Sequence, residues 1–213
     1  MSEGPRNRDD GSDSDRLPES LSDASNVLVL GSIPSAADRS VCRALLTRRP
    51  PASSNVLLVS LTGGADERLR ALEAAAGRLP ANVAVVSTRE RADSTTTMPG
   101  DVGTDITVET VSDPADLPKL GMNISRVLGE WEGEQTTSVC FDSLTALLQY
   151  ADRRRVFQFV QVLQDRAESL GGLTHYHMDP EAHDDRTIAT MRSLFDAIVE
   201  PSPDGDHTVR GQP

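Results

Sequence analysis

Short apolar runs alternate with amphipathic stretches along most of this 213-residue chain. The runs have the length of strands, and most are continuously apolar, which is typical of strands covered by helices on both faces. The alternation predicts an α/β protein with a mostly parallel sheet and helices on both faces. The expected strands are 27–30, 56–60, 83–87, 106–111, 138–141 and 173–177, and the expected helices are 66–79, 114–131, 144–150, 156–170 and 187–199, with another around Cys42, Leu45 and Leu46.

The two ends and one internal stretch of the chain have a different composition. Residues 1–25 are polar and offer almost nothing to bury, so they predict a disordered acidic tail. Residues 201–213 predict a second disordered tail, and residues 89–104, rich in Ser, Thr, Asp and Gly, predict an exposed loop. The chain is therefore expected to hold one domain, over residues 26–200.

The charge of the chain limits its partners. The formal net charge is -12, which argues against nucleic acid and anionic membranes, because both require a basic surface. Lys119 is the only lysine among 21 basic residues, and aspartate outnumbers glutamate, a balance that indicates a halophilic surface. No run approaches the roughly 20 apolar residues of a membrane span, and the N-terminus does not resemble a signal peptide. We expect a cytoplasmic protein.

The segment 31–40 lies between the first strand and the first helix, where a nucleotide-binding α/β protein carries its phosphate-binding loop. Gly31 fits the first position of G-x-x-x-x-G-K-[S/T], but Ala36 and Ala37 stand where the second glycine and the lysine belong. If the loop is two residues longer, Asp38 and Arg39 take those places. Either alignment removes the lysine that would hold the β and γ phosphates.

Two later segments carry a resemblance to a known family. Thr137-Ser-Val-Cys-Phe-Asp142-Ser143 has the form of a Walker B strand, and residues 157–199 read as a long helix, Gly-Gly, a strand, and a loop entering a further helix. Both resemble RecA/KaiC-like ATPases. More narrowly, residues 140–152 and 175–184 resemble a haloarchaeal family of unknown function, often labelled RecA-like or "HTR-like". The resemblance covers about residues 26–200.

The resemblance implies roles for particular residues. It assigns Asp142 to steering magnesium and Ser143 to the start of the next element, which with Gly31 and Arg39 would form a vestigial nucleotide site. The catalytic glutamates of the family follow the second strand, where this chain has Thr62 and Gly63. We therefore do not expect efficient ATP hydrolysis, nor ATP and magnesium as working cofactors.

A histidine cluster is the second candidate site. The strand period puts His175 and His177 on one face, and His183 follows in a short loop together with Asp179. Three histidines and a carboxylate could bind zinc or another divalent ion. The alternative is a core histidine bonded to a carboxylate such as Asp142 or Asp184, with the other histidine in solvent. The two cysteines, Cys42 and Cys140, are interpreted as buried small hydrophobic residues.

These observations leave three functional hypotheses beside a plain structural role. The leading one is a non-catalytic regulatory or signalling protein on a degenerate RecA/KaiC-like fold, acting through a protein partner or as a homo-oligomer. The second is a metal-binding protein or metal-dependent hydrolase that uses His175, His177 and His183. The third is a nucleotide sensor without turnover that uses Gly31, Arg39 and Asp142.

Overall fold

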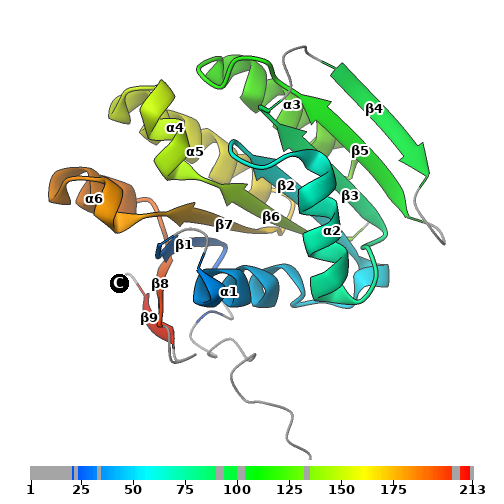
Figure 1. Ribbon diagram of the computed structural model, residues 1–213, viewed down its shortest axis with the longest axis horizontal. Coiled ribbons are helices and arrows are strands. Elements are labelled where there is room, and N and C mark those ends of the chain that lie inside the picture. Colours follow the sequence, from blue (N-terminus) through cyan, green and yellow to red (C-terminus); the bar gives the residue numbers. More distant parts are fainter. Residues whose placement is uncertain are drawn as a thin grey trace, which may run out of the picture.

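The computed structural model describes residues 21, 24–32, 35–89, 94–99, 104–131, 135–202 and 207–211. Their centre is one nine-stranded sheet with the order β4-β5-β3-β2-β6-β7-β1-β8-β9 (Figure 1). The seven strands from β5 to β8 are parallel, and β4 and β9 add antiparallel edges. The strands are β1 Asn26–Leu30, β2 Ser54–Ser60, β3 Asn82–Ser87, β4 Ser94–Pro99, β5 Asp105–Thr110, β6 Thr136–Asp142, β7 Leu173–Met178, β8 Ala197–Pro201 and β9 His207–Gly211.

Six α-helices of the described residues cover the sheet on both faces, as the sequence predicts. They are α1 Ala36–Leu46, α2 Ala65–Ala76, α3 Leu117–Glu130, α4 Leu144–Tyr150, α5 Arg153–Glu168 and α6 Asp185–Arg192. Figure 1 shows α1 and α2 on one face and α3, α4 and α5 on the other. The α/β class and the mostly parallel sheet are thus confirmed. No helix within the described ranges combines the length and the apolar character that crossing a membrane requires.

Three segments differ from the sequence-based predictions. The expected loop 89–104 contains β4, which pairs with β5 through its backbone although its side chains are mostly polar. The expected helix 187–199 ends early: α6 stops at Arg192, and Ala197–Pro201 forms β8 beside β1. The apolar residues of segment 187–199 have helical spacing, but the β-branched residues Ile198 and Val199 also suit a buried strand. The expected tail 201–213 contains β9, an edge strand on β8.

The predicted N-terminal tail also meets the domain. Leu21 is buried, with 1% of its surface exposed, in an apolar group that includes Val27 and Val41. The backbone N–H of Ser25 donates to the Asp196 carboxylate at 3.0 Å. The predicted boundary at residue 25 thus falls after residues that already contact the core; residues 1–20, 22 and 23 lie outside the described residues.

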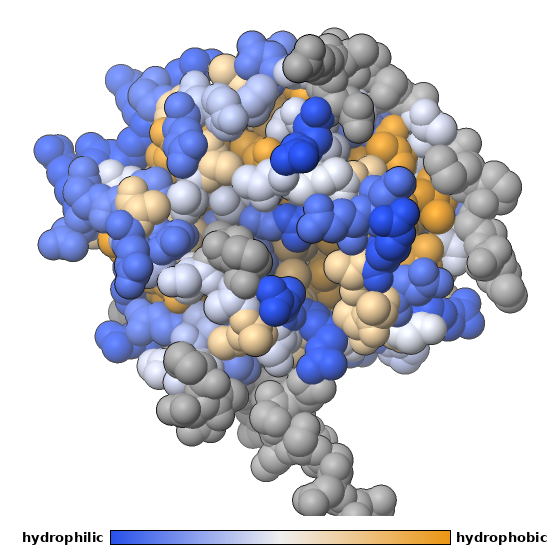
Figure 2. Space-filling view, viewed as in Figure 1, coloured by the Kyte–Doolittle hydropathy of each residue, from blue (hydrophilic) through white to orange (hydrophobic). Residues whose placement is uncertain are grey.

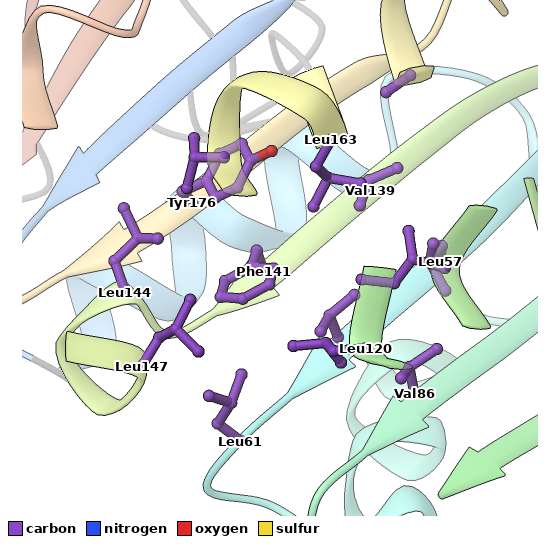
Figure 3. Packing of buried hydrophobic residues seen from close by; sticks show 14 of the residues in the cluster. Leu57, Leu61, Val86, Leu120, Val139, Phe141, Leu144, Leu147, Leu163 and Tyr176 are labelled. Atoms are coloured by element: carbon purple, nitrogen blue, oxygen red, sulfur yellow. The ribbon is translucent and has the colours of Figure 1, made fainter. Parts of the chain in front are cut away.

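The two faces of the sheet have different cores. The face under α3 to α6 holds one continuous apolar core, in which Phe141 stacks on Tyr176 with ring centroids 5.5 Å apart (Figure 3). On the face under α1 and α2 the apolar residues form two separate groups. One surrounds Val27 and Val29 of β1, and the other surrounds Val56, Leu58 and Cys140 of β2 and β6. The candidate site lies where these two groups meet, and it includes Cys140 and Cys42 from the edge of the second group.

Candidate functional site

Four side chains meet between β6, β7 and α1: Cys42, Cys140, His175 and His177. Cys140 of β6 and His175 of β7 are register partners, so their side chains leave the sheet side by side. His177 lies two residues along β7 and therefore points to the same face. Cys42 comes from α1, which packs over this part of the sheet. We call these four residues the Cys–His cluster.

The cluster is compact and buried. The Sγ atoms of Cys42 and Cys140 lie 3.6 Å apart, and His175 Nε2 lies 3.3 Å from Cys42 Sγ. One potential ligand atom from each of the four residues can be chosen so that all lie within 4.8 Å of one another. Cys140, His175 and His177 are buried, and Cys42 is half-buried. Neither cysteine forms a disulfide.

A carboxylate supports the cluster from α1. His177 Nδ1 lies 2.8 Å from Asp38 Oδ1, and both side chains are buried. Because Asp38 can only accept when ionised, Nδ1 carries the hydrogen and Nε2 is left as the nitrogen available to a ligand. The other histidine has no such support: His175 Nδ1 is buried without a hydrogen-bond partner among the described residues.

The surroundings shift the acidities of the cluster. Burial alone would lower the pKa of His177, but hydrogen bonds to Asp38 and Cys140 outweigh it and raise that pKa to about 10. The hydrogen bond from Cys42 lowers the pKa of the Cys140 thiol, with help from the nearby His175. The same hydrogen bond, together with burial, raises the pKa of Cys42. Cys140 is therefore the more thiolate-like sulfur, and the thiolate is the form that binds metal and reacts as a nucleophile.

The structure brings together two of the three predicted metal-ligating histidines. His175 and His177 are neighbours, with ring centroids 5.2 Å apart. His183 is elsewhere: its Nε2 lies 3.2 Å from Thr145 Oγ1 of α4. Asp179 caps the short turn Pro180–Ala182 through its bond to the Glu181 N–H. That turn starts at the C-terminal end of β7 and carries His183 to the α4 side, away from α1.

The predicted vestigial nucleotide residues have separate surroundings in the structure. The Gly31 N–H donates to the Met178 carbonyl at 3.1 Å, and a Cβ on Gly31 would lie 3.3 Å from the Pro201 ring. Arg39 is exposed on α1. The Ser143 hydroxyl accepts from the Ala146 N–H and caps α4, so Ser143 does begin the next element.

Asp142, at the C-terminal end of the central strand β6, forms an ion pair. Its Oδ2 pairs with Arg68 of α2, and Arg68 Nε donates to Ser60 Oγ at 3.0 Å. Ser60 Oγ also accepts from the Gly63 N–H at 3.0 Å. Arg68 and Ser60 thus connect the segment that follows β2 to Asp142.

Sequence reasoning missed four residues of this region: Cys42 and Cys140 as cluster members, Asp38 as the partner of His177, and Arg68 as the partner of Asp142. A usable signal was present for the cysteines. The chain has only two, each placed in an element that the α/β pattern puts beside the strand carrying His175 and His177.

Comparisons with known proteins identify the family and the fold. Residues 24–201 match the model of DUF7504, a family of unknown function. No curated protein matches the chain. A protein of Pyrococcus horikoshii OT3 is similar in structure, with a TM-score of 0.54 and 8% identity over 89% of this chain and 86% of its own.

Two further solved structures are similar. An uncharacterized protein from Pyrococcus horikoshii, in complex with an unknown peptide, has a TM-score of 0.56 and 13% identity over 89% of this chain and 92% of its own. A prototypical ATPase from the type III secretion system of pathogenic bacteria has a TM-score of 0.53 and 14% identity over 84% of this chain and 51% of its own. At these identities the likeness shows the fold alone, which is RecA-like.

Proposed function

This chain belongs to DUF7504, a family of unknown function, and we propose that it is a non-catalytic regulatory protein built on a degenerate RecA/KaiC-like ATPase fold. One observation carries the proposal. A buried carboxylate of the chain itself, Asp38, stands in the first turn of α1, the helix end that would receive nucleotide phosphates in such an ATPase.

The electrostatics at this helix end oppose phosphate binding. The positive end of a helix dipole attracts one anion, and here Asp38 is already that anion. The Ser35 hydroxyl accepts from the Asp38 N–H at 3.0 Å and caps the helix. His177 is already paired with the Asp38 carboxylate, so a phosphate would add further negative charge at this helix end without the lysine that usually offsets it. The single lysine, Lys119, belongs to α3 on the other face.

The magnesium end of the site is altered as well. Asp142 is 6% exposed and paired with Arg68, so its charge is balanced within the protein. Thr62 and Gly63 follow β2, where the resemblance places the catalytic glutamate, and neither can act as a general base. Among the described residues, this end of the sheet offers neither a lysine for the phosphates nor a general base, so we favour a regulatory role over turnover.

A polypeptide is the partner class that we favour. One structural neighbour with nearly full mutual coverage is in complex with an unknown peptide, so the same architecture can hold a peptide. The net charge of -12 argues against nucleic acid and anionic membranes, and the face shown in Figure 2, which is largely hydrophilic, is not the broad apolar surface that a membrane would take up. The partner is therefore another protein or a second copy of this chain.

The nucleotide question is tested by isothermal titration of the full chain with ATP and magnesium in molar potassium chloride, alongside a phosphate-release assay. We expect neither binding at millimolar ATP nor hydrolysis above background. Asp142→Ala is the control variant. Binding by the wild type that this variant loses would make the protein a nucleotide sensor, and hydrolysis lost in the same way would overturn the non-catalytic proposal.

The partner question is tested separately, by cross-linking the full chain in its source cells and identifying the linked peptides by mass spectrometry. We expect reproducible links to one polypeptide or between two copies, with light scattering separating the two cases. Links scattered over abundant proteins, at the frequency of an unrelated acidic protein used as a control, would contradict the regulatory role.

A further inference from the structure

The Cys–His cluster has the donor set of a structural metal site. Two sulfurs and two imidazoles converge from three elements that are distant in sequence, in a part of the core where apolar packing is interrupted. Two thiolates and two imidazoles in tetrahedral array are the set that selects zinc among the common divalent ions. We infer that Cys42, Cys140, His175 and His177 bind one Zn²⁺ ion between α1 and the β6–β7 pair.

The distances fit a mononuclear site. With Zn–S about 2.3 Å and Zn–N about 2.0–2.1 Å, the edges of a tetrahedron are about 3.8 Å between sulfurs and about 3.6 Å between sulfur and nitrogen. The structure has 3.6 Å between the two Sγ atoms and 3.3 Å between His175 Nε2 and Cys42 Sγ. All four ligand atoms lie within 4.8 Å of one another, so displacements of about 1 Å would bring the wider pairs to the tetrahedral edge lengths.

The second shell has the form that zinc-binding histidines usually need. His177 donates its Nδ1 hydrogen to Asp38, which leaves Nε2 as the nitrogen that would bind the ion. Such carboxylate–histidine pairs fix the tautomer and strengthen the nitrogen as a ligand. Asp38 would thus act as a partner that holds His177 in place, and it lies on the same helix as Cys42.

Charge balance favours an ion at this position. Two thiolates neutralise Zn²⁺, so the occupied cluster carries no net charge apart from the Asp38 carboxylate, which keeps its hydrogen bond. Binding releases the proton of each thiol that is not already ionised and of His177 when that ring is doubly protonated.

The four protein ligands leave no open coordination position. Catalytic zinc sites keep one position for water or substrate, whereas structural sites are closed by four protein ligands. The ion would therefore be structural: it would fasten α1 to the sheet and would not form a hydrolase centre. It does not depend on the proposed regulatory role.

The test uses the full-length chain, reduced with a non-thiol reductant, freed of metal and titrated with Co²⁺ and then Zn²⁺. We expect one Co²⁺ per chain, a thiolate-to-cobalt charge-transfer band, the visible bands of tetrahedral cobalt, and loss of all these bands when Zn²⁺ displaces it. Cobalt that binds without the charge-transfer band, or no binding by folded protein, overturns the inference.

Variants separate this site from chance binding. Cys42→Ser and Cys140→Ser should each weaken zinc affinity at least about 100-fold in chelator competition, because each removes a ligand. His183→Ala is the matched control and should bind as the wild type does, since His183 lies at Thr145. Equal affinity in the cysteine variants, or loss in His183→Ala, overturns the assignment.

A non-ligand variant keeps the test valid if a cysteine variant does not fold. Asp38→Asn preserves shape but removes the carboxylate charge behind His177. We expect zinc affinity to fall about 10-fold to 100-fold while the charge-transfer band of the cobalt form remains. Unchanged affinity in folded Asp38→Asn would contradict the role given to Asp38.

Discussion

The Sγ atoms of Cys42 and Cys140 lie 3.6 Å apart although 98 positions separate the two residues in the chain. The contact exists because α1 crosses over β6 and presents Cys42 to the strand that carries Cys140. It makes these thiols part of one site with His175 and His177.

The first prediction concerns metal and thermal stability. An ion that binds only the folded state stabilises it by about 2.7 kcal/mol when present at 100 times its dissociation constant. For a domain of this size that corresponds to a melting temperature about 5–10 °C higher with zinc than after chelation. Scanning calorimetry of the wild type and of Cys42→Ser measures it. The same zinc-dependent shift in Cys42→Ser would show that the ion acts elsewhere.

The second prediction concerns the ion pair between Arg68 and Asp142. Asp142 is nearly buried, so Arg68→Ala leaves a carboxylate without its counter-charge, and we expect a loss of about 2–3 kcal/mol in the free energy of unfolding. Arg70→Ala on the same helix is the control. Arg70 pairs with Asp66 at 3.9 Å in solvent, and its loss should cost less than about 0.5 kcal/mol. Urea unfolding of both variants measures the two losses in the free energy of unfolding. Equal losses would contradict the stronger effect expected for the buried pair.

The third prediction concerns a hydroxyl in the core. Tyr176 is fully buried, and its hydroxyl has no hydrogen-bond partner among the described residues. Burial without a partner also raises the pKa of this phenol. Tyr176→Phe keeps the ring stacked on Phe141 and removes the unsatisfied group, so stability should be unchanged or higher by about 1 kcal/mol. Phe141→Ala should instead lose about 3–5 kcal/mol. A clear loss in Tyr176→Phe would mean that the hydroxyl has a partner.

The fourth prediction concerns pH and the start of α6. Asp184 accepts from the Thr187 N–H at 2.6 Å, and this bond lowers the pKa of Asp184 below its usual 3.8. Because the folded pKa is the lower one, the stabilisation is present above the unfolded pKa and is lost as pH falls through the folded pKa. The stability advantage of wild type over Asp184→Ala should therefore shrink as pH falls below about 5 and through the folded pKa. Thermal melts of both proteins measure it, and an advantage that grows toward low pH would reverse the sign.

The fold was predictable because its signal is local. Most of the six expected strands are runs of mainly apolar residues, and all six appear as parallel strands of the sheet. The edge strands were not predictable in this way. β4 is rich in threonine, and β9 has Val209 as its one apolar residue, so neither offers an apolar run to recognise.

The candidate site was predictable only where it lies on one strand. The alternation of side chains in β7 pairs His175 with His177 without further information. The cysteines depend on the register of β6 against β7 and on the packing of α1, which no local pattern contains. His183 was grouped with the histidines by nearness in sequence, but the turn after β7 reverses the face on which it lies.

The division of the core under α1 and α2 has a consequence for how the molecule opens. The opposite face is held by one continuous apolar core, whereas the residues that surround the Cys–His cluster belong to two smaller groups on either side of it. The free energy needed to separate α1 from the sheet therefore depends on the Cys–His cluster and on whether it holds an ion. Amide hydrogens of α1 would exchange with solvent by local opening, at rates that depend on whether the cluster holds an ion. Those of β6 and β7 would exchange only when the whole domain unfolds. α1 is thus the part of this fold whose mobility a bound ion could turn on and off.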